Sequence, residues 1–380
     1  MNIGGCDAPG RFYEGETPFL LLDVDRILAN FEQVRASFGL LRPQVFYAVK
    51  ANADPRVLLA LHRAGCGFDV ASLNEINRLD ALGVPAAKMI FSATVKLPRH
   101  IEAAYALGVE RFAFDSPAEV AKLARLAPGS KVVVRLEVPH HGSRWPLGGK
   151  FGVPAAEAVD LLRLANASGL RPYGVTFHVG SQCTRSDTWL DAISVCRQVW
   201  NAARQEGIHL RLLNLGGGLP ARYTEDVPGV SEIGTQVMRR VISAFGRDIE
   251  YAIEPGRFLV ADAGTIVTTV IGTATRKGKP WVFVDQSVYA GLLEVIGGWT
   301  YPMVTRKDDR PKRRVTLAGP SCDSTDILAA DAELPELQVG DQILLLTAGA
   351  YTTSYQAYNG LSFPEVITVA GQRRAEVGAA

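Results

Sequence analysis

Eight short apolar runs follow one another along residues 45–253, and longer stretches of helical periodicity separate them. Most runs are rich in β-branched and aromatic residues and are nearly continuously apolar, as expected of strands buried on both faces of a parallel sheet. Helix-start patterns precede two of the periodic stretches, at Asp54-Pro55 and at Ser116-Pro117 with Glu119. The runs occupy residues 45–49, 67–71, 89–92, 111–114, 131–136, 174–179, 212–215 and 251–253.

This alternation predicts an α/β fold, a (β/α)₈ TIM barrel. No helix pattern follows the eighth strand, but the amphipathic stretch 25–37 precedes the first strand and is expected to fill that position. After about residue 256 the helical rhythm gives way to β-branched or alternating runs, which predict a second, mainly β C-terminal domain. We therefore expect a barrel over residues 24–256 and a mainly β domain formed by residues 1–23 and 257–380. The later runs cover residues 265–274, 281–284, 315–317 and 342–347.

Composition narrows the class of protein. The 380 residues are 47% hydrophobic and 21% charged with a net charge of +1, which is ordinary for a globular protein. There is no basic face with interleaved aromatics for nucleic acid, and no apolar stretch of signal-peptide or membrane-span length. The five cysteines are scattered without a C-x-x-C pair, so neither a disulfide framework nor a zinc site is expected. We expect a cytoplasmic protein without a metal centre.

Polar residues stand where the predicted strands end, which is where a barrel of this kind places its chemistry. Lys50 ends the first strand, Asp69 lies in the second, and His178 lies in the sixth. The seventh strand runs into 216–218, a triple glycine, and the eighth into 254–257, Glu-Pro-Gly-Arg. His140 and His141 have no such neighbours and are interpreted as loop residues.

Each of these residues has an ordinary structural interpretation when taken alone. Lys50 could reach solvent, Glu254 could pair with an arginine, and His178 could be a hydrogen-bonded core histidine. Taken together they describe one ligand. Desolvation would make the amine of a lysine neutral, so that the amine can react with an aldehyde. An acidic side chain can bind a pyridinium nitrogen. Glycines with Arg257 form a charge-assisted phosphate site, and a histidine stacks on a flat ring. That ligand is pyridoxal 5'-phosphate.

The same residues lie in segments that resemble the fold-type III pyridoxal-phosphate-dependent amino acid decarboxylases, in the ornithine/lysine decarboxylase branch. The order and spacing of the segments agree over roughly residues 20 to 370. The matching segments are 46–52 (FYAVKAN), 67–72 with Glu75, 177–181 (FHVGS), 216–218, 254–257, 319–323 (GPSCD), 349–351 (GAY) and 358–360 (YNG).

The resemblance implies a role for individual residues. Lys50 would hold the cofactor covalently, His178 would stack on its ring, and Glu254 would bind the ring nitrogen. Asp69 and Glu75 are similar to acidic positions near the lysine and ring. The phosphate would be held by Ser181, Gly218, Gly256, Arg257 and Tyr351.

The resemblance also implies a homodimer with composite active sites. Cys322 of the partner subunit would reprotonate the substrate α-carbon after carbon dioxide leaves, and Asp323 would contact the distal amine of a diamino acid. The expected reaction is decarboxylation of a basic amino acid, ornithine, lysine or a longer or substituted relative, to its amine, as in polyamine biosynthesis. The alternatives are a decarboxylase for a specialised-metabolite amino acid, a racemase of the same fold and a non-catalytic, decarboxylase-like protein that binds a regulator.

The sequence departs from this branch at two segments. Before Lys150-Phe151-Gly152, the stretch Arg144-Trp145-Pro146 differs from the family's usual arginine arrangement. After Asp285-Gln286-Ser287-Val288-Tyr289, where the family usually carries a Tyr-Asp pair, this chain has Gly297-Gly298, with Glu294 three residues earlier. Glu294 is therefore a candidate second carboxylate for the distal amine. The glycines remove bulk, so we expect a roomier pocket in which ornithine is a poor substrate compared with a longer or substituted amino acid.

Overall fold

The computed structural model describes residues 16–354 and contains a closed barrel of eight parallel strands. The barrel closes between the last and first of these strands, where Ile253 pairs with Val45. All eight apolar runs form the predicted strands, so the TIM barrel is confirmed. In barrel order the strands are β2 (Gln44–Ala48), β3 (Gly67–Val70), β4 (Met89–Phe91), β5 (Arg111–Phe114), β6 (Lys131–Arg135), β8 (Arg171–Thr176), β10 (Leu212–Asn214) and β11 (Glu250–Ile253).

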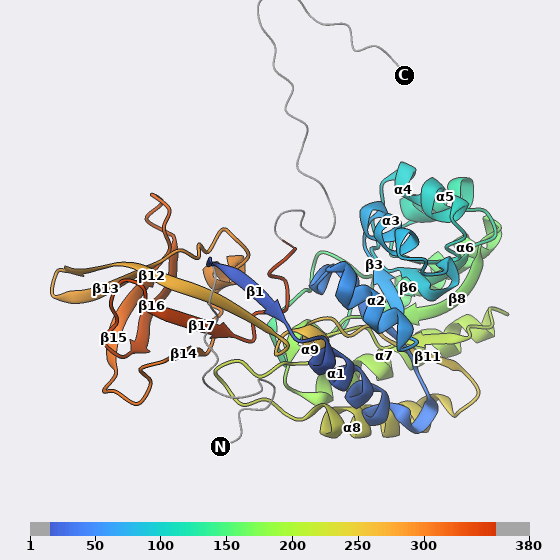
Figure 1. Ribbon diagram of the computed structural model, residues 1–380. Helices are drawn as coiled ribbons and strands as arrows, with labels where there is room; N and C mark the ends of the chain where they lie inside the picture. Colours follow the sequence, from blue (N-terminus) through green and yellow to red (C-terminus); the bar gives the residue numbers. More distant parts are fainter. Residues whose placement is uncertain (1–15, 355–380) are drawn as a thin grey trace, which may run out of the picture.

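Helices surround the barrel, and local sequence fixes where they begin. Asp54 caps α2 by accepting a hydrogen bond from the Arg56 N–H, and Ser116 caps α5 through the Glu119 N–H. Helix α1 packs against both α2 and α8 (Figure 1), the position predicted for it in the helical ring. The helices are α1 (Val24–Ser37), α2 (Pro55–Arg63), α3 (Leu73–Ala81), α4 (Pro98–Ala106), α5 (Pro117–Leu126), α6 (Ala155–Ala167), α7 (Ser186–Gln205), α8 (Val230–Phe245) and α9 (Arg257–Val260).

A second, mainly β domain lies beside the barrel (Figure 1). It is a seven-stranded sheet in the order β14-β17-β12-β13-β15-β16, with β1 from the start of the chain added alongside β12. This confirms the predicted mainly β C-terminal domain. The strands are β1 (Phe19–Leu22), β12 (Gly264–Arg276), β13 (Lys279–Val284), β14 (Met303–Thr305), β15 (Arg313–Ala318), β16 (Ile327–Leu334) and β17 (Gln342–Leu346).

The two domains meet at the C-terminal mouth of the barrel. The N–H of Tyr351, after β17, donates to the Ala51 carbonyl at 2.6 Å, and the Asn52 amide donates to the Gly349 carbonyl at 2.9 Å. Two smaller elements lie at this mouth, the 3₁₀ turn η2 (Val49–Ala51) and the two-stranded pair β7 (Ser143–Trp145) and β9 (Ser181–Cys183). The other 3₁₀ turns are η1 (Gly39–Leu41), η3 (Ala86–Lys88) and η4 (Leu293–Gly297).

Some sequence-based expectations concern residues outside the described range. The motif 358–360 and the outer parts of the predicted β domain, residues 1–15 and 355–380, are among them. Between residues 16 and 354, no helix is long and apolar enough to cross a membrane.

Candidate active site

Lys50 lies in η2, directly after β2, at the C-terminal mouth of the barrel. Its Nζ atom is 3.4 Å from Oδ2 of Asp69 on the neighbouring strand β3. The Asp69 carboxylate raises the pKa of Lys50 well above its ordinary value, and this outweighs burial, which lowers it. The expectation of a lowered pKa for Lys50 is therefore wrong, because a carboxylate lies within ion-pair distance and outweighs desolvation. Oδ1 of Asp69 is buried without a hydrogen-bond partner among residues 16–354.

Glu254 follows β11 and is buried at the same mouth. Its Oε1 accepts one hydrogen bond from Ser92 Oγ at 2.6 Å and another from Asn214 Nδ2 at 2.7 Å. Burial, assisted by the negative charge of Asp69, raises the pKa of Glu254 to about 7. The carboxyl group can therefore hold or release a proton near neutral pH.

Glu75 is a second buried acid, located in the first turn of α3. Its Oε2 accepts a hydrogen bond from the Ala71 N–H at 2.7 Å, which ties the end of β3 to the helix. Burial raises the pKa of Glu75 to about 8. The positive charge of Lys50 acts in the opposite direction, so this acid senses the lysine electrostatically.

His178 lies just beyond β8 and faces the glycine loop. The Gly180 N–H donates to its Nδ1 at 2.9 Å, so Nε2 carries the proton of the neutral ring. Burial and the positive charge of Arg135 place the pKa of His178 well below its ordinary value, which keeps the imidazole neutral. A Cβ atom at Gly217 would lie 3.2 Å from His178 Nε2 and 2.5 Å from the Glu254 carbonyl oxygen, so only glycine lets these strand ends meet.

The phosphate candidates lie together beside this loop. Gly218 has a φ of +112°, and a Cβ atom there would lie 2.5 Å from the Gly180 carbonyl oxygen. Ser181 Oγ accepts a hydrogen bond from Arg257 Nε at 3.2 Å. A Cβ atom at Gly256 would lie 3.7 Å from the hydroxyl oxygen of Tyr351. The structure therefore brings all five predicted phosphate-binding residues to one place.

Arg257 and Glu294, assigned to different ligands from the sequence, form an ion pair with each other. Nη2 of Arg257 lies 2.6 Å from Oε1 of Glu294, and Nη1 lies 2.9 Å from Oε2. Nη1 also donates to the hydroxyl of Tyr223 at 2.8 Å. The guanidinium fork predicted for phosphate and the carboxylate predicted for the distal amine are thus directed at each other.

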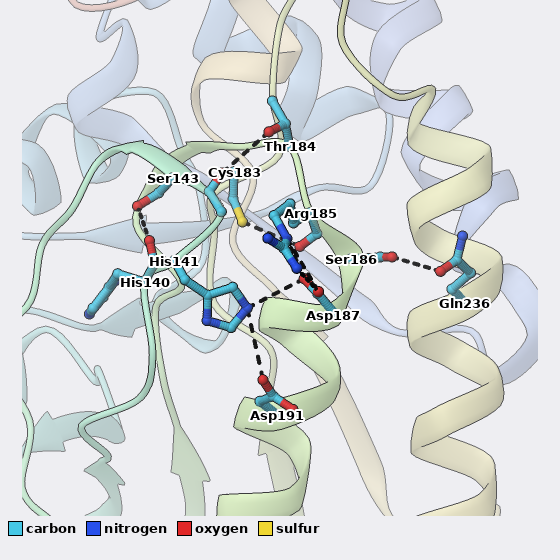
Figure 2. Close-up of polar contacts among 11 residues, drawn as sticks. His140, His141, Ser143, Cys183, Thr184, Arg185, Ser186, Asp187, Asp191 and Gln236 are labelled. Carbon is cyan, nitrogen blue, oxygen red and sulfur yellow. Dashed lines mark hydrogen bonds and ion pairs between the residues drawn. The ribbon is translucent and has the colours of Figure 1, made fainter.

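The connection after β6 is anchored to the start of α7 (Figure 2). Nε2 of His141 lies 3.4 Å from Asp187 and 3.8 Å from Asp191. Ser143 Oγ donates to the His140 carbonyl oxygen at 2.9 Å. Both histidines are loop residues, as predicted, and the loop they belong to leads into β7.

Trp145, in β7, lies against Gly297, in the segment where this sequence departs from the ornithine/lysine decarboxylase branch. A Cβ atom at Gly297 would collide with the Trp145 ring, whereas one at Gly298 would meet open space. Arg144 Nη2 also donates to the Gly298 carbonyl oxygen at 2.6 Å. The expectation that both glycines enlarge the pocket is therefore wrong at Gly297, because an indole ring occupies that volume.

Cys322 and Asp323 lie on the connection between β15 and β16, and both are exposed in the single chain. The Asp323 carboxylate accepts hydrogen bonds from the backbone N–H and hydroxyl of Thr325, which lower its pKa. Within residues 16–354, neither Cys322 nor Asp323 has a hydrogen bond to Lys50 or Asp69. Their predicted roles require a second subunit.

Sequence reasoning missed four side chains that shape the site, namely Ser92, Asn214, Tyr223 and Trp299. Ser92 could have been found, because it ends an apolar run and strand ends were the criterion applied to Lys50. Asn214 ends a buried strand, where an amide side chain needs polar partners. No sequence pattern points to Tyr223 or Trp299.

The buried polar groups at the mouth fit pyridoxal phosphate. The glycine loop offers a close approach to backbone N–H groups for a phosphate, and Asp69 Oδ1 is an unused buried acceptor. Glu254, with its pKa near neutrality, suits the ring nitrogen. In contrast, no group of three or more His, Cys, Asp or Glu residues within 16–354 could hold a metal ion.

Comparison with known proteins agrees with this chemistry. Residues 24–261 match the family described as pyridoxal-dependent decarboxylase, pyridoxal binding domain. The lysine/ornithine decarboxylase of Selenomonas ruminantium is 38% identical over 349 residues, which cover 90% of this chain and 87% of that protein. The crystal structure of SrLDC in complex with PLP and cadaverine superposes with a TM-score of 0.85 at 36% identity, covering 91% and 89% of the two chains. The arginine decarboxylase of Paramecium bursaria Chlorella virus, bound to agmatine, gives 0.85 at 28% identity, covering 92% and 93%.

The barrel, its buried mouth and these similarities define a pyridoxal-phosphate-dependent amino acid decarboxylase of fold type III. Within that class, the chain belongs to the ornithine/lysine decarboxylase family. Pyridoxal 5'-phosphate is its cofactor.

Proposed function

We propose that this enzyme decarboxylates a basic amino acid, ornithine, lysine or a longer or substituted relative, to the corresponding amine. The observation that carries the proposal is that Lys50, Asp69 and Glu254 lie at one barrel mouth, in a chain of this family. The relatives support the substrate class, because they are named for lysine, ornithine and arginine. All three substrates carry a positive charge at the end of the side chain.

Each residue at the barrel mouth would have a separate role. Lys50 would hold the cofactor through its amine, and Asp69 would keep that amine oriented between turnovers. The neutral imidazole of His178 would cover one face of the ring, and Glu254 would hold the proton of the ring nitrogen. When bound, the cofactor supplies the electron sink that allows the bond to the substrate carboxylate to break.

The glycine loop, Ser181, Gly256, Arg257 and Tyr351 would surround the phosphate. The remaining groups would come from a second copy of the chain in a homodimer. Cys322 of the partner subunit would deliver a proton to the substrate α-carbon, and the partner's Asp323 would bind the distal amine. Their exposure in the single chain is consistent with this arrangement, since both are accessible to another subunit. A buried distal ammonium needs such a carboxylate.

Purified protein supplied with pyridoxal phosphate and a panel of amino acids tests the proposal. We expect carbon dioxide release from at least one of ornithine, lysine and arginine, and sedimentation as a dimer. The same panel includes amino acids whose side chains are one methylene longer or shorter than those of these three, and a neutral isostere such as norleucine. Turnover restricted to amino acids without a distal positive charge would show that the substrate class is wrong and would favour the specialised-metabolite alternative.

A further inference from the structure

The Arg257–Glu294 ion pair at the barrel mouth is almost completely buried. Only 4% of the Arg257 side chain and 10% of the Glu294 side chain are exposed. The two groups meet through two parallel N–H···O contacts, the geometry that gives the strongest arginine–carboxylate interaction. Glu294 is supplied by η4 of the β domain, and Arg257 by α9 at the end of the barrel. The pair therefore crosses the junction between the two domains.

The guanidinium group is held on its faces as well as its edges. Its central carbon lies 4.0 Å from the centroid of the Trp299 ring and 4.7 Å from that of Tyr351. Nε is directed to Ser181, and Nη1 is shared between Tyr223 and Glu294. Most N–H groups of this arginine are already used by the protein.

The pair also lies next to the phosphate candidates. Ser181 contacts Arg257 directly, Gly256 precedes it in the chain, and the Tyr351 ring covers the guanidinium. A phosphate bound there would bring up to two negative charges close to the buried Glu294 carboxylate. Like charges repel strongly where water is excluded, so the carboxylate would offset the attraction of Arg257 for the phosphate.

We propose that Glu294 is a positioning residue that fixes Arg257 and neutralises its charge, and so weakens the grip of this site on the cofactor's phosphate. The inference rests on the proposed placement of the phosphate beside Arg257. It also removes Glu294 from the set of carboxylates available to a distal amine, because both of its oxygens are committed to Arg257. The distal amine is then left to Asp323 of the partner subunit.

The test uses Glu294→Gln, which keeps the shape and one acceptor oxygen but removes the charge. The matched control is Glu119→Gln. Glu119 is a buried carboxylate 2% exposed, 2.9 Å from Lys96 and 2.5 Å from Lys122, and it has no place in the cofactor site. Cofactor-free wild type and both variants are titrated with pyridoxal phosphate and with pyridoxal, which lacks the phosphate. Their melting temperatures are measured in parallel.

We expect both variants to melt at lower temperature, because each loses one partner of a buried ion pair. Only Glu294→Gln should bind pyridoxal phosphate more tightly, by about tenfold or more, equivalent to about 1.4 kcal/mol. Its affinity for pyridoxal should stay within about twofold of wild type. A residue with a purely structural role would lower stability and affinity together.

Unchanged or weaker binding of pyridoxal phosphate by Glu294→Gln overturns the inference, provided that wild type binds the cofactor. Failure of wild type to bind pyridoxal phosphate would instead refute the proposed function. If Glu294→Gln does not fold, Glu294→Met serves as a second neutral variant. If neither folds, inorganic phosphate is titrated into cofactor-free wild type. The inference requires a dissociation constant above about 1 mM, only about 4 kcal/mol of binding free energy, and tighter binding contradicts it.

Discussion

Each end of the barrel carries an ion pair with a short N···O distance, but the two pairs differ in how far their side chains are exposed. At the C-terminal mouth, Arg257 and Glu294 are 2.6 Å apart and almost completely buried. At the opposite end, Lys131 and Glu110 are 3.0 Å apart, with 29% and 60% of their side chains exposed. Water screens the second pair and leaves the first nearly unscreened.

The difference shows why distance alone does not locate a functional site. At the mouth, burial is the largest cause of the raised pKa values of Glu75 and Glu254. At the opposite end, the pKa of Glu110 is lowered, and the cause is its exposed hydrogen bond to Lys131. Desolvated groups shifted toward neutral pH indicate chemistry, whereas screened pairs indicate a solvated surface.

The largest effect is expected at the centre of the mouth. Lys50→Ala should lower decarboxylation by roughly 10³-fold or more, because it removes the amine proposed to hold the cofactor. The melting temperature should change little, since Lys50 contributes little packing. Carbon dioxide release, together with borohydride reduction and peptide mapping of the wild type, measures this. Cofactor trapped on a different lysine would show that Lys50 has been wrongly assigned.

The buried acids should make the stability of the cofactor-free protein depend on pH. Burial raises the pKa of Glu75 to about 8 and that of Glu254 to about 7, so the folded state binds more protons than the unfolded state between pH 5 and 8. The free energy of unfolding should therefore fall as pH rises through this window, by on the order of a few kcal/mol. Glu75→Gln should flatten the decline in urea titrations. Parallel pH profiles for wild type and variant would contradict this cause.

Asp323 tests whether an exposed group can become part of a buried site. Asp323→Ala should lower kcat/KM by at least tenfold, about 1.4 kcal/mol, because a distal ammonium would lose its counter-charge in the proposed dimer. Steady-state kinetics with the preferred substrate measures the loss, and sedimentation checks that the variant assembles as the wild type does. Unchanged kcat/KM would mean that another group binds the distal amine.

Cys322→Ala should alter the products more than substrate binding. Without this acid, protonation at the substrate α-carbon slows, and some turnover ends in abortive transamination at the cofactor. Product analysis by mass spectrometry should show the aldehyde or its derivative beside the amine. Full rate with clean amine would reduce Cys322 to an exposed surface residue.

The smallest effect is expected at the opposite end of the barrel. Lys131→Ala should change the free energy of unfolding by no more than about 1 kcal/mol and leave turnover unchanged, because its pair with Glu110 is exposed. Thermal unfolding and the decarboxylation assay measure both quantities. A large loss of activity would show that the end of the barrel opposite the mouth also affects catalysis, which contradicts this expectation.

The sequence predicts the barrel well because each strand carries its own burial pattern and each helix its own start signal. The positions of Lys50, Glu254 and His178 follow from one rule, that strand ends meet at one mouth. What the sequence does not predict are contacts between segments with no shared pattern. Trp145 fills the space at Gly297, and Glu294 reaches Arg257, although they come from separate loops. The sequence places Asp69 near Lys50 but does not show that the charge of Asp69 outweighs desolvation in setting the pKa of Lys50.

The pairing of β1 with β12 makes the barrel an insertion within the β domain. Phe19 of β1 pairs with Val267 of β12, so β1 can pair only after the whole barrel has been synthesised. We expect the barrel to fold first as the chain emerges, since its neighbouring strands are close in sequence. The sheet then closes around β12 and brings Glu294 and Tyr351 to the mouth. Assembly of the cofactor site is therefore a late event in folding, which links cofactor capture to completion of the chain.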